Sequence, residues 1–293
     1  MNSANGFVGV MDSGVGGVSV LKALKAILPY ESYIYLSDSI NAPYGVRAAD
    51  DIRRAVLDNA QLLLRMGAKA LVIACNTATA VAVEALRSSY PTVYIVGVEP
   101  AVRPALEYAI KNSGDVLVLT TNATVHEPRF YSLCERCCAE LGGMFVNDEK
   151  NNFRLLNSKE GNSCPRVYPL SIQKTVTYVE HGKGESEINT DYLREMLAPL
   201  AEHRFSAVVE GCTHFPFAEK SIVKALGYEP RFFDGALGAA KRLRFLLEKN
   251  RLIGSHTCGW GEWIEWLDTG GSIERIKCAR GLFRSSHSPA DTK

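Results

Sequence analysis

Two cysteines of this chain, Cys75 and Cys212, occur in the same kind of local sequence. Each follows a short apolar run that predicts a β-strand, and each precedes two residues whose side chains form hydrogen bonds. These polar neighbours are Asn76 and Thr77 in the first case and Thr213 and His214 in the second. A lone cysteine after a buried strand is most often a small hydrophobic core residue. Packing does not require polar neighbours at both positions, however, so the matched pair favours two reactive thiols.

Two thiols on opposite faces of one carbon suit the racemisation of an α-amino acid. One thiolate removes the Cα proton while the opposite thiol delivers a proton to the other face. A free cysteine has a pKa of about 8.5, so each thiol needs a neighbour that accepts or supplies its proton, and Asp12 and His214 are the candidates. The carbanionic transition state also needs donors that hold the substrate carboxylate. We expect these donors among Asn76, Thr77, Thr213 and the backbone amides near Ser13.

The glycine-rich segment Asp12-Ser13-Gly14-Val15-Gly16-Gly17 closes the first predicted strand and opens a helix. It offers an acceptor, a hydroxyl group and flexible backbone amides at a helix N-terminus, which suits the binding of a carboxylate. The rival interpretation is a dinucleotide-binding loop, with Asp38 at about the offset of a ribose-binding acid. The third glycine of that fingerprint is missing because position 19 is serine, which disfavours a nucleotide.

Two other segments place polar residues after predicted strands. The segment Asn41-Ala42-Pro43-Tyr44-Gly45 is either a turn that projects Tyr44 toward the same strand ends or an ordinary Pro-Tyr turn. Residues 120–124 carry three threonines that offer hydroxyl groups, although capping of a helix alone would account for one of them.

The elements that must position these residues alternate between strand and helix. Predicted strands cover residues 7–11, 33–36, 70–74, 92–98, 116–119 and 207–209, and predicted helices cover 18–28, 48–66, 78–88 and 192–201. This alternation predicts an α/β fold of open, mostly parallel sheets with helices on both faces. The repeated strand–cysteine motif implies two related halves. Since ligands of parallel sheets lie at the carboxyl ends of the strands, each half would present its cysteine to a shared cleft.

Two segments do not fit the alternation. Residues 147–163 are polar, rich in Asn and Lys and without an apolar period, so we expect a surface loop or insertion there. After Asn250 the composition changes, and Trp260, Trp263 and Trp266 gather in one short segment interrupted by glycine. The end of the chain is polar from Arg284 on. The sequence assigns no function to this C-terminal segment.

The composition excludes several classes of protein. The chain has 293 residues, of which 46% are hydrophobic and 22% charged, as expected of a globular protein with one or two cores. A net charge of +1 argues against nucleic acid as the primary partner. The first apolar run, residues 7–11, is too short for a signal peptide or a membrane span, so we expect no membrane association and a cytoplasmic location.

The cysteines fit a reducing compartment. Eight cysteines at irregular spacing in a long chain indicate free thiols rather than a disulfide framework. Cys134, Cys137 and Cys138 lie three and four residues apart on a predicted helix. No second Cys-x-x-Cys or His pair accompanies them, so we expect them to pack in the core rather than bind a metal.

Together these residues resemble the glutamate racemases of the aspartate/glutamate racemase superfamily, from Phe7 to about Leu247. Six ordered motifs carry the resemblance: Asp12–Gly17, Asp38 with Pro43-Tyr44-Gly45, Ala74–Ala78, Val96–Pro100, Thr121 with Thr124, and Gly211–Pro216. The resemblance implies two pseudosymmetric α/β domains with the active site in the cleft between them, and final helices that return to the first domain. We therefore expect a first domain of residues 1–100 plus about 217–250, a second of 101–216, and a C-terminal extension of 251–293.

The resemblance also implies an activity, the interconversion of L-glutamate and D-glutamate for peptidoglycan synthesis, with no cofactor and no metal. By matching motif, Cys75 and Cys212 would be the catalytic pair, assisted by Asp12 and His214. The implied substrate-lining residues are Ser13, Tyr44, Gly45, Asn76, Thr77, Thr121, Thr124 and Thr213. The sequence leaves the oligomeric state open, a homodimer being one possibility.

The second half departs from the family pattern at two places. The family runs from a Cys-Pro pair almost directly to Val-Glu, whereas here Cys164-Pro165 and Val179-Glu180 are far apart. The resemblance implies that Glu180 is the acid that partners His214, but this role is carried over from the family across a longer intervening segment. Glu210 stands where the family has an apolar residue, and a carboxylate near Cys212 would disfavour its thiolate.

Three other functions remain open from the sequence. An aspartate racemase would use the same two-thiol chemistry, because aspartate and glutamate differ by one methylene, worth about 1–3 kcal/mol in a fitted pocket. A glutamate-binding protein without activity could keep the fold. A cysteine hydrolase with Cys212 as nucleophile and His214 as base would leave Cys75 without a role.

Overall fold

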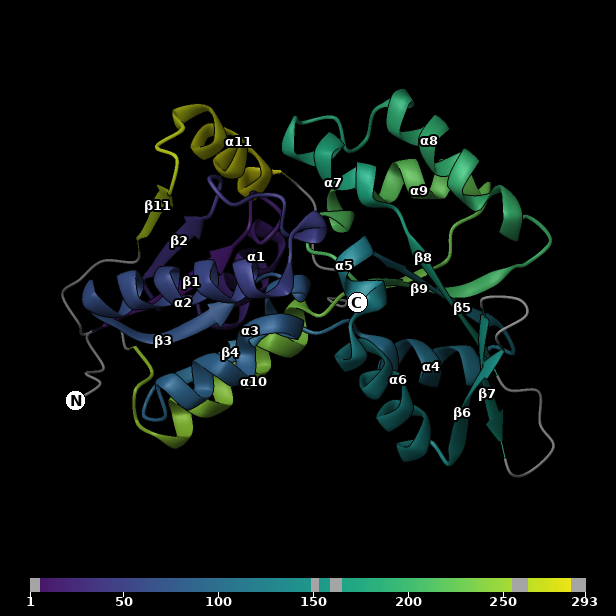
Figure 1. Cartoon of the computed structure of the whole chain (residues 1–293), viewed down its shortest axis with the longest axis horizontal. Helices are drawn as coiled ribbons and strands as arrows, with labels where there is room; N and C mark the ends of the chain where they lie inside the picture. The colour runs from purple at the N-terminus through teal and green to yellow at the C-terminus, as the bar shows by residue number, and fades with distance from the viewer. Residues whose placement is uncertain (1–5, 149–152, 159–164, 255–262, 286–293) are drawn as a thin grey trace. The chain divides into compact units, whose positions relative to one another are not determined.

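The computed structural model describes residues 6–148, 153–158, 165–254 and 263–285. The chain divides into two compact units, one made of Met1–Glu99 with Gly235–Thr292 and the other of Pro100–Asp234. Each unit is built around its own sheet, and Figure 1 labels the helices and strands of both.

Within its described residues, the first unit has a five-stranded parallel sheet in the order β11-β2-β1-β3-β4. The strands are β1 (Phe7–Asp12), β2 (Tyr33–Ser37), β3 (Ala68–Ile73), β4 (Tyr94–Gly97) and β11 (Ile264–Asp268). Every residue of β1, β2 and β3 is buried. Central parallel strands are covered on both faces, which explains their nearly continuous apolar sequences.

Helices cover both faces of this sheet (Figure 1). They are α1 (Val18–Ile27), α2 (Ala49–Arg65), α3 (Asn76–Ser89), α10 (Ala236–Lys249) and α11 (Ile273–Arg284). On one face, α2 and α3 bury an apolar cluster against β1 and β3. On the other, the Tyr33 hydroxyl lies 3.1 Å from the carbonyl oxygen of Leu24 and 2.9 Å from that of Leu28, at the end of α1. α1 packs in turn against α10 and α11.

The second unit has, in the part that the structure describes, a six-stranded mixed sheet in the order β10-β9-β5-β8-β7-β6. The strands are β5 (Asp115–Thr120), β6 (Gly143–Asp148), β7 (Phe153–Ser158), β8 (Arg166–Ser171), β9 (Phe205–Glu210) and β10 (Arg231–Phe233). β10, β9, β5 and β8 pair in parallel. β7 runs antiparallel to both β6 and β8.

The hairpin of β6 and β7 corrects the prediction of a loop at residues 147–163. β6 ends inside that segment and β7 lies within it, whereas 149–152 and 159–163 fall outside the described residues. The sequence of β7, FRLLNS, has no strict alternation of apolar and polar residues. Its strand conformation follows from backbone pairing with β6 and β8, which a local apolar pattern does not reveal.

The helices of the second unit are α4 (Val102–Lys111), α5 (Asn122–His126), α6 (Pro128–Glu140), α7 (Gln173–Glu180), α8 (Glu187–Leu197) and α9 (Glu219–Leu226). α4 and α6 bury an apolar cluster against β5 and β9. Cys134, Cys137 and Cys138 are part of this cluster, which confirms their predicted packing role.

The two units share one strand order. Numbered in chain order, four parallel strands of each unit are arranged 2-1-3-4: β2-β1-β3-β4 in the first, which β11 extends beyond β2, and β8-β5-β9-β10 in the second. Cys75 and Cys212 therefore follow equivalent strands, β3 and β9. The predicted fold class, two related α/β halves with mostly parallel sheets, is confirmed.

The division between the units differs from the predicted boundaries. We expected the chain to return to the first unit at about residue 217, but the return comes at Gly235. α9 packs against α8, and β10 pairs with β9. Residues 219–233 therefore belong to the second unit, as part of its sheet and of the helices that pack around it. The described residues 263–285 are not a separate extension, because β11 pairs with β2 and α11 packs on α1.

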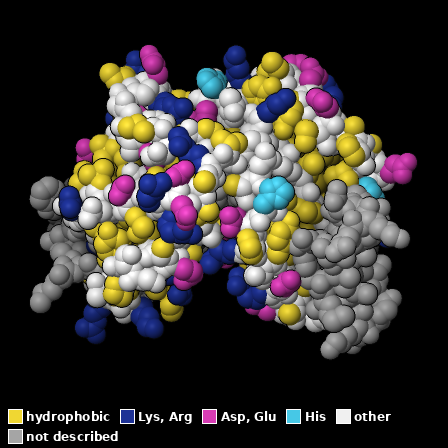
Figure 2. Space-filling model, in the orientation of Figure 1, with side chains coloured by type: hydrophobic (Ala, Val, Ile, Leu, Met, Phe, Trp, Pro, Cys, Tyr) yellow, Lys and Arg dark blue, Asp and Glu magenta, His cyan; other side chains and the backbone are white. Residues whose placement is uncertain are grey.

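The surface carries charges of both signs. On the face shown in Figure 2, Lys and Arg side chains are interspersed with Asp and Glu over the coloured residues. Among the helices of the described segments, none has the length and apolar character needed to span a bilayer.

Candidate active site

Cys75 follows β3 and caps the N-terminus of α3. Its Sγ accepts a hydrogen bond from the backbone N–H of Ala78 at 3.4 Å, and its thiol lies 3.9 Å from Ser13 Oγ. The side chain is buried. The amide and the positive end of the α3 dipole both stabilise negative charge on sulfur, so this position suits a thiolate.

Asp12 is the last residue of the neighbouring strand, β1, and the first residue of the glycine-rich segment. Its Oδ2 accepts a hydrogen bond from the backbone N–H of Gly17 at 2.7 Å. A Cβ at position 17 would lie 2.7 Å from the Asp12 Cβ and 3.0 Å from the Ala74 Cβ, so only glycine fits there. The Gly17 amide at the start of α1 thus donates to a buried carboxylate. In a dinucleotide-binding loop, this amide would instead face a phosphate group.

Tyr44 lies in a short 3-10 turn, η1 (Tyr44–Val46), and its hydroxyl donates to Asp38 Oδ2 at 2.6 Å. Burial raises the pKa of Tyr44 far above its ordinary value of 10, and the hydrogen bond and charge of Asp38 add to it, followed by the charges of Cys75 and Asp12. Cys75, Asp12 and Tyr44 therefore share one electrostatic environment. Asp38 is committed to this tyrosine, which argues further against a ribose-binding role.

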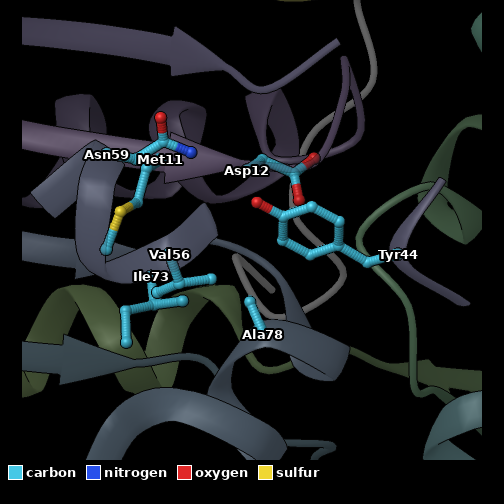
Figure 3. Close-up of a pocket in the computed structure, with 7 residues that line it drawn as sticks. All are labelled: Met11, Asp12, Tyr44, Val56, Asn59, Ile73 and Ala78. Carbon is cyan, nitrogen blue, oxygen red and sulfur yellow. The ribbon is translucent and has the colours of Figure 1, made fainter. Parts of the chain in front are cut away.

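A small pocket opens beside Asp12 and Tyr44 (Figure 3). Its lining residues are Met11, Asp12, Tyr44, Val56, Asn59, Ile73 and Ala78. Figure 3 shows Asp12 and Tyr44 at one end, and Asn59 beside Met11 at the other. Asn59, on α2, did not stand out in the sequence because a single Asn inside a helical pattern carries no motif.

In the second unit, Cys212 follows β9 and is linked through His214 to Glu180. Cys212 Sγ lies 3.5 Å from His214 Nδ1, and His214 Nε2 lies 2.6 Å from Glu180 Oε1. His214 is 2% exposed and the Glu180 side chain 8%, so little water screens this chain of contacts. The stretched segment before Val179 thus does not prevent Glu180, at the end of α7, from reaching His214.

His214 carries a raised pKa. Burial lowers it, but the hydrogen bond and charge of Cys212, together with those of Glu180, outweigh burial and bring the pKa well above 6.5. In the imidazolium form both ring nitrogens donate, one to Cys212 Sγ and one to the Glu180 carboxylate. The arrangement stabilises a thiolate at Cys212.

Two of the predicted lining threonines contact each other at the start of α5. Thr121 caps α5 by accepting from the Thr124 N–H at 3.3 Å, and the two hydroxyl oxygens lie 3.0 Å apart. Capping accounts for the side chain of Thr121 but not for that of Thr124. Four other predicted lining residues are buried: Ser13, Asn76, Thr77 and Thr213.

Glu210 is buried beside Cys212 without a hydrogen-bond partner for either carboxylate oxygen among the described residues. Burial raises its pKa well above 4.5, and the charges of Glu219, Asp234 and Cys212 act in the same direction. The carboxyl group therefore keeps its proton to a higher pH than a free glutamic acid does, and the protonated form carries no charge that would oppose a thiolate. Gly211, which follows it, passes so close to β5 that a Cβ would lie 2.6 Å from the Leu119 carbonyl oxygen.

The structure brings the predicted residues together within each unit. Ser13, Asp12, Tyr44 and Cys75 gather at the carboxyl ends of β1 and β3. Cys212, His214 and Glu180 form the second group. No sequence motif marks Thr269, which donates a hydrogen bond to Asp38 from a position 231 residues away.

Comparison with known proteins agrees with this geometry. Residues 8–243 match the family model of Asp/Glu/Hydantoin racemase. The chain is 32% identical to glutamate racemase of Clostridium botulinum over 286 residues, which cover 98% of this chain and 100% of the relative. It is 37% identical to glutamate racemase of Clostridium kluyveri over 250 residues, 85% of this chain and 87% of the relative. The family model ends at residue 243, close to the expected limit at about Leu247, whereas the first of these relatives matches beyond it.

Solved structures show the same fold. Escherichia coli glutamate racemase, in complex with L-glutamate and the activator UDP-MurNAc-ala, superposes with a TM-score of 0.75 at 26% identity, covering 95% of each chain. Glutamate racemase of Thermus thermophilus, in complex with beta-chloro-D-alanine, gives a TM-score of 0.71 at 26% identity, covering 98% of this chain and 96% of that one. On the combined matches of sequence and fold, this chain belongs to the Asp/Glu/Hydantoin racemase family and, within it, to the glutamate racemases.

Proposed function

We propose that this protein interconverts L-glutamate and D-glutamate without a cofactor, with Cys75 and Cys212 as the paired acid and base. The observation that carries the proposal is the equivalence of the two cysteines, each at the carboxyl end of the third parallel strand of its unit. Each also has its own means of stabilising a thiolate, the N-terminus of α3 for Cys75 and His214 for Cys212.

The proton balance of the reaction is simple. In one direction, the thiolate of one cysteine takes the Cα proton and becomes a thiol, while the other thiol gives its proton to the opposite face of Cα and becomes a thiolate. The reverse direction exchanges these roles. Asp12 and His214 return each sulfur to the protonation state required for the next cycle.

The remaining polar groups fit a charged amino acid. Asn76 Oδ1 is buried without a hydrogen-bond partner among the described residues, which suits it to accept from the substrate ammonium group. The hydroxyl groups of Thr77, Thr124 and Thr213 and the amides near Ser13 are the proposed donors to the carboxylates. The Tyr44 hydroxyl is bonded to Asp38, so this residue would serve the substrate through its ring and backbone.

The physiological role follows from the product. D-glutamate is a building block of peptidoglycan, and we propose that the protein supplies it. A cytoplasmic location and a homodimeric assembly stay predictions, to be tested by cell fractionation and by light scattering of the purified protein.

The function is tested by solvent isotope exchange. Purified protein is incubated in D₂O with L-glutamate and, separately, with L-aspartate, and loss of the Cα proton is followed by NMR while the D-enantiomer is quantified by chiral chromatography. We expect deuterium at Cα and D-glutamate from the first substrate only. Exchange with aspartate alone would replace glutamate by aspartate as the substrate, and exchange with neither would refute the racemase proposal.

Single cysteine variants test the mechanism. Cys75→Ser and Cys212→Ser should each abolish net racemisation, because a hydroxyl group with a much higher pKa than a thiol cannot replace either partner. The matched control is Cys138→Ser, a cysteine buried in the α4–α6 core, which should lower stability but not remove activity. Turnover that survives in both catalytic-site variants would exclude the two-thiol mechanism.

A further inference from the structure

The C-terminal segment reaches the carboxylate of Asp38. β11 pairs with β2 so that Asp268 lies beside Ser37. The next residue, Thr269, donates from its backbone N–H to the carbonyl oxygen of Ser37 at 2.9 Å and from its Oγ1 to Asp38 Oδ1 at 2.9 Å. The backbone N–H of Ile40 donates to the same Oγ1 at 3.2 Å. The Thr269 hydroxyl is thus fixed by one donated and one accepted hydrogen bond.

Neighbouring contacts hold the same two segments together. Ser39 Oγ donates to Asp268 Oδ2 at 2.7 Å, and the backbone N–H of Gly270 donates to Ser39 Oγ at 3.1 Å. A Cβ at position 270 would lie 2.6 Å from Ser39 Oγ, so the close approach requires glycine. Residues 268–270 therefore clamp the loop that runs from β2 toward η1.

Asp38 connects this clamp to the turn that carries Tyr44. The carboxylate is 1% exposed. Its Oδ2 accepts from the Tyr44 hydroxyl at 2.6 Å, and Asn41 Nδ2 lies 3.1 Å from both oxygens. A buried carboxylate depends on protein donors because no water replaces a lost one. Removal of the Thr269 donor therefore leaves Oδ1 underbonded and frees the carboxylate to rotate, and the Tyr44 hydroxyl must follow it.

We propose that Thr269 is a positioning residue of the racemase site, which acts through Asp38 to fix the orientation of Tyr44 and of the turn Tyr44–Val46. This inference rests on the proposed function, in which Tyr44 and Gly45 line the substrate. It makes the segment of β11 and the following turn a part of the site, although none of its residues is adjacent in sequence to a cysteine.

The test compares two substitutions at one position. Thr269→Val replaces the hydroxyl group by a methyl group of similar size, and Thr269→Ser keeps the hydroxyl. We expect Thr269→Val to lower kcat/KM for L-glutamate about tenfold or more, mainly through KM, because a misplaced binding turn weakens substrate contacts. Thr269→Ser should restore kcat/KM to within about threefold of the wild-type value. Hydrogen exchange of the peptide spanning residues 38–47 should rise in the Val variant and return to normal in the Ser variant.

The control is Ser272→Ala in the same segment. Ser272 caps α11, its Oγ accepting from the Arg275 N–H at 3.3 Å, and its side chain has no contact with Asp38 in the described structure. This variant should loosen α11 while kcat/KM and exchange at 38–47 stay at wild-type values. Equal losses of kcat/KM in Ser272→Ala and Thr269→Val would overturn the inference, because the effect would then be one of general stability.

The two proposals fail in different ways. Wild-type activity together with an unchanged Thr269→Val variant overturns the role of Thr269 and leaves the racemase assignment intact. A wild-type protein without racemase activity refutes the proposed function, and unchanged exchange at residues 38–47 in Thr269→Val then refutes the coupling through Asp38 as well.

Discussion

His214 sets the electrostatics of the second cysteine because it contacts Cys212 on one side and Glu180 on the other. Both partners raise its pKa against the opposing effect of burial. A histidine whose pKa rises on folding adds stability that is fully present below its unfolded pKa of about 6.5 and is lost as pH rises through the folded value.

Glu180→Gln removes the charge from this pair and keeps its shape. We expect kcat/KM to fall about 10²-fold, because His214 then holds its proton less firmly and stabilises the Cys212 thiolate less. The loss of unfolding free energy should be largest near pH 6 and shrink as pH rises, measured by urea titration at several pH values. Glu185→Gln, which breaks a surface pair with Lys220, is the control and should change neither quantity. A stability loss that grows with pH would contradict the assignment.

Glu210 gives a pH dependence of the same sign, because its pKa is also raised on folding. Its pKa is raised in the folded protein, so the folded state must retain a proton that the unfolded chain releases above about pH 4.3. Stability relative to an uncharged variant therefore falls as pH rises toward the folded pKa. We expect Glu210→Leu to stabilise the protein by about 1–3 kcal/mol at pH 8 and by less at pH 5, measured by urea unfolding. A gain that does not depend on pH would contradict a raised pKa of Glu210.

The sequence predicts those functional residues that are recognised by their immediate neighbours in the chain. The flanking residues of Cys75 and Cys212 mark both cysteines, and a carboxylate at position 210 stands out in an apolar run. The contact of Thr269 with Asp38 is invisible in the sequence, because it joins residues from the two ends of the chain that only the pairing of β11 with β2 brings together.

At the scale of elements, a buried ion pair joins three segments of the first unit. Lys69, in β3, lies with its Nζ 2.7 Å from Glu31 Oε2, and the two side chains are 1% and 2% exposed. Lys69 Nζ also donates to the carbonyl oxygen of Leu252 at 2.8 Å, and the Gly254 N–H donates to Glu31 Oε1 at 2.6 Å. The pair thus fixes the chain after α10 to the start of β3 and to the loop before β2.

Breaking this pair on one side should be costly. Lys69→Met leaves the Glu31 carboxylate buried without its counterion, and we expect a loss of about 3–5 kcal/mol in unfolding free energy. The double variant Lys69→Met with Glu31→Leu removes both charges and should be more stable than the single variant. Urea unfolding of the two variants and the wild type measures the difference. If the double variant is the less stable of the two, an unpaired Glu31 charge does not account for the loss in Lys69→Met.

Elements with a strong local period are predicted from the sequence, and those defined by pairing are not. α1, α2 and α3 follow their apolar spacing, and β1, β2 and β3 follow their buried runs. β7 and β10 are short strands that owe their conformation to a neighbouring strand. The error in the domain boundary has the same origin, because only the pairing of β10 with β9 shows that residues 231–233 belong to the second unit.

At the scale of the whole molecule, the repeated strand order carries two different sets of partners. Cys75 has Ser13 and the start of α3, whereas Cys212 has His214 and Glu180. Enantiomers have equal free energies in water, so the equilibrium constant of racemisation is one whatever the enzyme. The values of kcat/KM for the two directions must therefore be equal, although kcat and KM need not be.

This thermodynamic constraint yields a prediction for the proposed racemase. We expect kcat and KM to differ between L-glutamate and D-glutamate because the two proton donors are unlike, while the two kcat/KM values agree at every pH. Initial rates by circular dichroism from each enantiomer measure this directly. In Glu180→Gln both kcat/KM values should fall by the same factor. Equal kcat values in both directions across the pH range would show that the two partner sets are energetically equivalent.

The pairing of β11 with β2 has one more consequence, which concerns association between molecules. A strand at the margin of a sheet exposes a row of unpaired N–H and C=O groups that can add a strand from another chain. Every residue of β2 is buried, and most of them are large and hydrophobic. At an exposed edge of the sheet, β2 would therefore readily pair with a strand of another chain. β11 covers it from Tyr33 to Ser37 and offers in its place a five-residue strand bearing Glu265 and Asp268. The C-terminal segment thereby removes β2 from the edge of the first sheet, where it could pair with a strand of another chain.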